Sequence, residues 1–141
     1  MPPARAAGPR PGEPGEFVVT WVVDGDTVKI RGGSKVRYIG IDTPERGEPF
    51  YREALRRNIE LVKGRAVRLD FCEEEPTDRY GRLLAWVYAD GELVNLTLVR
   101  EGLARALIIP PCGLKHAGEI REAEREARRK GLGLWYSRTG D

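Results

Sequence analysis

Apolar and polar residues alternate in several short stretches of this chain, a pattern typical of half-buried β-strands. Three strands are predicted over residues 17–23, 26–31 and 35–41, joined by turns at Asp24-Gly25 and Gly32-Gly33. Because glycine tolerates the positive φ of tight turns, the three segments are expected to form an antiparallel meander. Two further strands are predicted over residues 66–72 and 82–88, with a short return after Asp90-Gly91.

The apolar residues follow the helical period elsewhere. The segment 49–62 repeats them on one face, at Tyr51, Ala54, Leu55, Ile59 and Val62. Helices are also predicted over residues 94–101 and 115–130, each followed by a glycine that suits a helix C-terminus. Residues 107–111 are apolar but broken by prolines, which predicts a packed irregular segment, and Leu132, Leu134 and Trp135 are expected to hold the tail on the core.

The order of these elements indicates an α+β protein that is mainly β, because no strand–helix–strand repeat is present. We predict an OB-fold five-stranded barrel with three α-helices, since such a barrel accommodates three strands, a helix, two strands and two helices in succession.

Composition sets the boundaries of this domain. Five of the ten prolines fall in the first fourteen residues, which predicts a disordered arm over residues 1–15 without the apolar core of a secretory signal. The folded domain is then residues 16–137, followed by a flexible tail over 138–141. No apolar run approaches the roughly 20 residues that a membrane span needs, and nothing in the pattern demands more than a monomer. The net charge of +2 is too small to argue for nucleic acid by itself.

Acidic residues stand where predicted strands meet turns. Asp26 and Asp42 occupy two such positions, and Pro44 frees the backbone carbonyl of Thr43 from regular pairing. Two carboxylates, a carbonyl and waters are ligands that suit Ca²⁺, which accepts about 6 to 8 oxygens. The alternative is that Asp26 only ends a hairpin turn and Asp42 only starts an Asx turn.

Three further charged residues complete a set suited to phosphate chemistry. Glu45 lies across the Thr-Pro turn from Asp42, where a general base for an attacking water is useful. Arg37 and Arg82 carry planar guanidinium groups that can each grip two phosphate oxygens. The alternatives are a solvated loop acid and surface arginines paired with neighbouring acids.

The cysteines and the histidine exclude a zinc finger, because Cys72, Cys112 and His116 provide too few ligands. His116 is expected to lie on the surface near a helix start. The residues alone leave open whether Cys72 and Cys112 form a disulfide or remain free thiols.

Taken together, three motifs resemble the staphylococcal nuclease (thermonuclease) family. They are Asp-Gly-Asp-Thr-Val from Asp24, Arg37 followed by Asp42-Thr-Pro-Glu45, and Asp-Arg-Tyr-Gly-Arg from Asp78 to Arg82. The resemblance extends from about Phe17 to Trp135. It implies an OB barrel and calcium-dependent hydrolysis of single-stranded or locally melted DNA and RNA to 3′-phosphate products.

The resemblance also assigns roles to individual residues. It implies that Asp26, Asp42 and the Thr43 carbonyl bind Ca²⁺, that Glu45 activates water, and that Arg37 and Arg82 hold the phosphate. Arg79 and Tyr80 match a basic-Tyr step that contacts a neighbouring phosphate.

Two departures from the family pattern concern binding. Ile108 and Pro110 stand where family members with strong nucleotide binding carry tyrosines, and the loop after Glu45 is shortened to Arg46-Gly47-Glu48-Pro49. We therefore expect weaker substrate binding with the chemistry intact.

The resemblance brings Cys72 near Cys112, which favours a disulfide and hence an oxidising, secreted or cell-envelope location. The competing hypothesis for function is a non-catalytic OB-fold module that binds nucleic acid or protein. Such modules usually lack one or more of the catalytic acids and arginines, whereas this sequence retains all of them.

Overall fold

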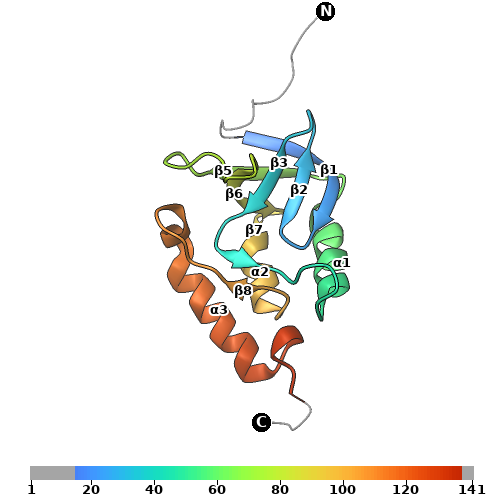
Figure 1. The fold of residues 1–141 in the computed structure, drawn as a ribbon, viewed down its shortest axis with the longest axis vertical. Coiled ribbons are helices and arrows are strands. Elements are labelled where there is room, and N and C mark those ends of the chain that lie inside the picture. Colours follow the sequence, from blue (N-terminus) through green and yellow to red (C-terminus); the bar gives the residue numbers. More distant parts are fainter. Residues whose placement is uncertain (1–14, 138–141) are drawn as a thin grey trace, which may run out of the picture.

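The computed structural model describes residues 15–137 (Figure 1). Apart from Gly15, the predicted N-terminal arm lies outside the described residues, as does the tail over 138–141. The strands are β1 (Gly15–Asp24), β2 (Thr27–Ile30), β3 (Lys35–Tyr38), β4 (Ile41–Asp42), β5 (Ala66–Phe71), β6 (Leu83–Ala89), β7 (Glu92–Leu93) and β8 (Arg105–Ala106). The helices are α1 (Tyr51–Val62), α2 (Val94–Arg100) and α3 (Ala117–Lys130), with 3₁₀ turns η1 (Cys112–His116) and η2 (Gly133–Trp135).

Five strands close into a barrel in the order β3-β2-β1-β5-β6, because β3 also pairs with β6. The β3–β6 pairing is parallel and the other four are antiparallel. Helix α1 packs along β1, while α2 lies between the barrel and α3 (Figure 1). The predicted five-stranded OB barrel with three helices is therefore confirmed.

The core fills the barrel with the inward residues of the alternating strands. Side chains with at most 1% exposure come from all five strands and include Val19, Val28, Ile30, Val36, Leu69 and Trp86. Burial of this apolar surface stabilises the fold at roughly 25 cal/mol per Å². The alternating pattern that predicted the strands thus corresponds to one continuous core.

The predicted strand over residues 35–41 is divided in the structure. It breaks at Ile39-Gly40, where Gly40 has a φ of 84° and its Cα faces the Trp86 ring; a Cβ at Gly40 would lie 2.7 Å from that ring. After the break, β4 leaves the barrel and pairs with β8, which the sequence pattern did not predict. This break turns Asp42 away from the barrel wall.

Helix boundaries and faces also differ in part from the prediction. Helix α1 begins at Tyr51 because Phe50 has a φ of 69°. On α1 the buried positions are Ala54, Asn58 and Val62, whereas Ile59, assigned to the apolar face, is 37% exposed.

The last helix, predicted to begin at Lys115, starts at Ala117 after the η1 turn. The His116 side chain, expected at the surface, is only 16% exposed, since its ring packs edge-on against Trp86. Within the described residues, no helix is both long and apolar enough to cross a membrane.

Candidate active site

The turn between β1 and β2 carries the most buried acid of the site. Asp26 is 5% exposed, and its Oδ2 accepts a hydrogen bond from the Thr43 backbone N–H at 3.0 Å. Its Oδ1 accepts a bond from the Thr27 hydroxyl at 3.2 Å. The turn and the segment around Thr43 pack closely here, since a Cβ on Gly25 would lie 2.7 Å from the Thr43 hydroxyl. Asp26 and Thr43, predicted to act together, are therefore joined directly.

Arg37 lies between two of the predicted carboxylates. Its Nη2 is 3.4 Å from Asp26 Oδ2 and 3.6 Å from Asp42 Oδ1, while its Nη1 donates to the Tyr38 carbonyl at 2.5 Å. The neighbouring strand residues Val36 and Tyr38 point into the core, so the alternation along β3 directs Arg37 outward. The guanidinium thus supplies positive charge between acids that would otherwise repel one another.

Burial and the nearby Asp26 carboxylate raise the pKa of two acids at this end of the barrel. Burial, followed by the neighbouring Asp26 carboxylate, raises the pKa of Asp24 to about 6. Burial and then Asp26 also raise the pKa of Asp42, although Arg37 acts in the opposite direction. An electrostatic field of this sign attracts cations.

Arg82 reaches the same region from the start of β6. Its Nε donates to Asp78 Oδ2 at 2.8 Å, and its Nη1 lies 3.5 Å from the Thr27 hydroxyl. Thr27 pairs with Arg37 across β2 and β3, so both predicted arginines approach one residue. Burial acts to raise the pKa of Asp78, but hydrogen bonds from Arg82 and Tyr80 outweigh it and leave that pKa below its usual value.

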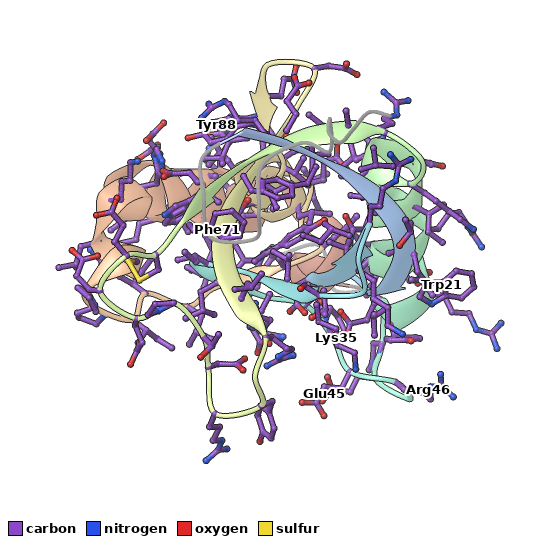
Figure 2. The ribbon with its side chains drawn as sticks, turned by 90° about the horizontal axis from the view of Figure 1, so that it is seen from above. Trp21, Lys35, Glu45, Arg46, Phe71 and Tyr88 are labelled. Carbon is purple, nitrogen blue, oxygen red and sulfur yellow. A yellow bond between two sulfur atoms is a disulfide. The ribbon has the colours of Figure 1, made fainter. Side chains whose placement is uncertain are left out.

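Glu45 lies on the exposed loop that follows Asp42 (Figure 2). Its backbone N–H donates to Glu48 Oε1 at 2.7 Å, and its carbonyl accepts from the Glu48 N–H at 2.9 Å. These two bonds fold the shortened loop into a tight turn with the Glu45 side chain exposed. The Glu45 carboxylate is therefore open to a substrate from solution, three residues along the chain from Asp42.

Arg79 and Tyr80 border a pocket of about 400 Å³ that also reaches Arg37 and Arg82. The Tyr80 ring is 68% exposed, and the guanidinium carbons of Arg79 and Arg82 lie 5.1 and 5.3 Å from its centre. Cations over an exposed aromatic ring form a surface suited to a base and its phosphate.

The pocket wall corrects one expectation. Leu107 and Ile109 line it, whereas Ile108 is half-buried and packs against the core and Pro110 is exposed outside the pocket lining. Alternate side chains after β8 point in opposite directions. Leu107 and Ile109 therefore form this wall, instead of Ile108 and Pro110, the positions compared with the family tyrosines. The side of the pocket formed by residues 107–109 is therefore aliphatic, and the exposed ring of the lining is that of Tyr80.

The donor set fits a hard divalent cation. Asp26 and Asp42 offer carboxylate oxygens and Thr43 would add its backbone carbonyl, all of which are ligands that Ca²⁺ accepts. Among residues 15–137, the one His, Cys, Asp or Glu trio whose ligand atoms lie within 4.8 Å is Cys72, Glu74 and Cys112. The sulfurs of that trio form a disulfide, so they are not thiolate ligands. A cation at the acidic end would rely on two carboxylates supplemented by water.

Sequence reasoning missed four residues that build the site. The sequence pattern assigns Asp24 only to a turn, although its position two residues before Asp26 indicates a shared environment. The Glu48 carboxylate accepts a hydrogen bond from the Glu45 N–H and so stabilises the turn that carries Glu45. Asn58 accepts a bond from the Tyr38 hydroxyl at 2.7 Å and donates to the Asp24 carbonyl at 2.9 Å. Asn95 donates to the Ile39 carbonyl at 2.7 Å and accepts from the Val87 N–H at 2.9 Å.

A disulfide joins Cys72 and Cys112 at the edge of the same pocket. It ties the end of β5 to the η1 turn, across 40 residues of sequence. The segment that carries Leu107 and Ile109 is thereby held against the barrel.

Comparison with known proteins places these observations in a family. The model of the family described as staphylococcal nuclease homologue matches residues 35–137. Endonuclease YncB of Bacillus subtilis is 41% identical over 122 residues, and the SPbeta prophage-derived endonuclease YokF of the same organism is 39% identical over 122. Thermonuclease of Staphylococcus intermedius is 38% identical over 128 residues, which cover 84% of this chain and 75% of that protein.

The two Bacillus matches each cover 80% of this chain but only 58% of YncB and 41% of YokF. The chain therefore spans about half the length of these relatives. The matched family region contains Arg37, Asp42, Glu45 and Arg82. On these grounds the chain belongs to the staphylococcal nuclease homologue family.

Proposed function

We propose that this protein is a calcium-dependent, largely sequence-nonspecific phosphodiesterase that hydrolyses DNA and RNA and leaves 3′-phosphate products. The observation that carries the proposal is the convergence at one end of the barrel. Arg37 lies between Asp26 and Asp42, while Arg82 approaches the neighbouring Thr27. The endonuclease and thermonuclease names of the relatives support hydrolysis of nucleic acid.

The charged residues divide the work of the reaction. Arg37 and Arg82 bind the equatorial oxygens of the phosphodiester and stabilise the negative charge that develops on them. Asp78 holds the Arg82 guanidinium through its Nε, which leaves the Nη nitrogens directed toward Thr27 and the phosphate. Because these contacts are to phosphate rather than to base edges, little sequence specificity is expected.

Glu45 acts as the general base. Its carboxylate accepts a proton from water as the water oxygen bonds to phosphorus, and the P–O5′ bond breaks. The 5′-oxygen takes up a proton from solvent water and leaves as a hydroxyl, and the phosphate remains on the 3′-oxygen. Asp26, Asp42 and the Thr43 carbonyl would hold Ca²⁺, which when bound supplies positive charge that lowers the energy of the charged transition state.

Substitutions at these positions test the assignment on single-stranded DNA. Glu45→Gln should lower kcat by about 10² to 10⁴, because it removes the general base. Arg82→Lys should lower kcat by about 10² to 10³, because it weakens one donor to the transition state. Glu53→Gln is the matched control, because Glu53 is an exposed acid on the first turn of α1.

Mass analysis of the product ends should detect 3′-phosphate and 5′-hydroxyl groups. Full activity in both Glu45→Gln and Arg82→Lys would show that the assigned roles are wrong. Products with 5′-phosphate ends would refute the proposed bond cleavage.

A further inference from the structure

Three residues form a row across the outer surface of the barrel, which we call the Trp21 row. Trp21 on β1 pairs with Lys29 on β2, and Lys29 pairs with Lys35 on β3. Directly paired residues of an antiparallel sheet project from the same face. The adjacent residues Val28 and Val36 are fully buried, so the Trp21 row faces solvent.

Trp21 is unusually placed for a large aromatic residue. The register shift between Val19 and Trp21 leaves both Thr20 and Trp21 outside the barrel, and the Trp21 side chain is 55% exposed. Lys63, just beyond α1, places its Nζ 4.8 Å from the centre of the Trp21 ring. One lysine therefore lies over the ring while the next strand presents another beside it.

The surface around the row carries positive charge outside the acidic turn. From Phe17 to Arg37 the basic residues are Lys29, Arg31, Lys35 and Arg37, and the acids are Asp24 and Asp26 alone, both at the turn of the candidate active site. Strands β2 and β3 contain no acidic residue. A nearly neutral protein thus concentrates positive charge beside an exposed indole.

The row leads directly into the candidate active site. Lys35 lies two residues before Arg37 on the same outward face of β3. In the parallel pairing of β3 with β6, Val36 lies opposite Leu83. Lys35, which precedes Val36, therefore lies at the same end of the pairing as Arg82, which precedes Leu83. Along the barrel surface through β2 and β3, the path from Trp21 to Arg82 crosses three strand spacings, about 15 Å. The Trp21 side chain points away from the barrel in Figure 2, and Lys35 lies on the opposite side of the barrel from Tyr88.

We propose that the Trp21 row binds the part of a single-stranded nucleic acid that flanks the cleaved phosphate, with Trp21 stacking on a base and Lys29 and Lys35 contacting phosphates. This inference rests on the proposed nuclease function and adds a binding surface to it. Tyr80 is the exposed ring that borders the site pocket, and the row adds a second base contact farther from the cleaved phosphate.

Stacking and phosphate contacts each make a measurable contribution to the affinity for a single strand. Stacking of a base on an aromatic side chain is lost on substitution by alanine at a cost of about 5-fold to 150-fold in affinity. Each phosphate contact in a single strand contributes about 0.7 to the slope of log K against log salt concentration. An OB fold typically covers about 4 to 16 nucleotides, which is enough to reach from the site to Trp21.

Binding is measured by fluorescence anisotropy of a labelled single-stranded DNA 12-mer in chelator, where cleavage cannot interfere. Trp21→Ala should weaken binding at least about 5-fold, and Trp21→Phe should restore most of it. The double variant with Lys29→Ala and Lys35→Ala should reduce the salt slope by about 1.4. Arg68→Ala is the matched control, since Arg68 stacks on Tyr88 on another surface of the barrel, 3.9 Å from the ring centre, and should leave binding unchanged.

Cleavage assays separate this inference from the proposed function. With Ca²⁺, Trp21→Ala should raise KM for the 12-mer more than for a trinucleotide, while kcat changes little. The proposed binding role of the Trp21 row is wrong if the unmutated protein does not bind the 12-mer. It is also wrong if neither Trp21→Ala nor the lysine substitutions change that binding. Row-dependent binding without Ca²⁺-dependent cleavage would refute the nuclease proposal and leave the binding surface standing.

Discussion

Asn95 offers a direct test of how the chain holds the active-site strand in place. Its side chain is fully buried on α2 and bonds two backbone groups far apart in the sequence, the Ile39 carbonyl and the Val87 N–H of β6. Ile39 lies at the break between β3 and β4, so this anchor sets the course of the chain between Arg37 and Asp42. We expect Asn95→Ala to lower the free energy of unfolding and to make the positions of Arg37 and Asp42 less fixed.

The magnitude follows from the two groups left without a partner. A buried polar group that loses its hydrogen bond costs about 1 to 3 kcal/mol, so two such groups cost about 2 to 6 kcal/mol. Domains of this size have a free energy of unfolding of about 5 to 15 kcal/mol. With a urea m value of about 2 kcal/mol/M, the midpoint of unfolding should fall by about 1 to 3 M.

Thr97→Ala is the matched control on the same helix. Thr97 is buried, but its hydroxyl bonds the carbonyl of Leu93, the residue just before α2, at 3.3 Å. Its loss removes one weak bond and should cost about 1 kcal/mol or less. Urea unfolding followed by circular dichroism measures both variants; if Asn95→Ala is no less stable than Thr97→Ala, the anchoring argument is wrong.

The remaining predictions concern the disulfide, Asp78 and the pocket wall. Reduction of the disulfide that spans 40 residues should lower the free energy of unfolding by about 4 kcal/mol on the chain-entropy account, and equal urea midpoints with and without reductant would contradict it. Since the pKa of folded Asp78 lies below its unfolded value of 3.8, its contribution is fully present above that pH and is lost as the pH falls toward the lowered pKa. The stability difference between the unmutated protein and Asp78→Asn should therefore be constant from pH 5 to 7 and shrink below pH 4; a difference that grows on acidification would reverse the assigned sign. Ile109→Tyr should lower KM for single-stranded DNA, because it adds a stacking ring to an aliphatic wall, and an unchanged KM would show that this wall does not meet the base.

The strands and the charged set were accessible from sequence because their signals are local. Alternation placed Val36 and Tyr38 inside and Arg37 outside, and turns fixed where Asp26 and Asp42 emerge. The prediction of the fold rested on the same periodicity together with the family motifs.

The features that sequence reasoning missed depend on contacts between distant segments. The break after Tyr38 is set by the packing of Gly40 against Trp86 and by the bond from Asn95 to Ile39, neither of which a strand pattern contains. Asn58 occupies an inward position on α1 because it bonds the Asp24 carbonyl, although its polarity predicts exposure. The raised pKa of Asp24 likewise arises from burial in the folded state.

The central claim is that the acids and arginines at the end of the barrel make this protein a calcium-dependent nuclease. The most direct measurement is degradation of denatured DNA by the unmutated protein in Ca²⁺ and in chelator. We expect the protein to cleave the DNA in Ca²⁺, to stop in chelator and to cleave again when Ca²⁺ is restored. Intact DNA under all three conditions would contradict it.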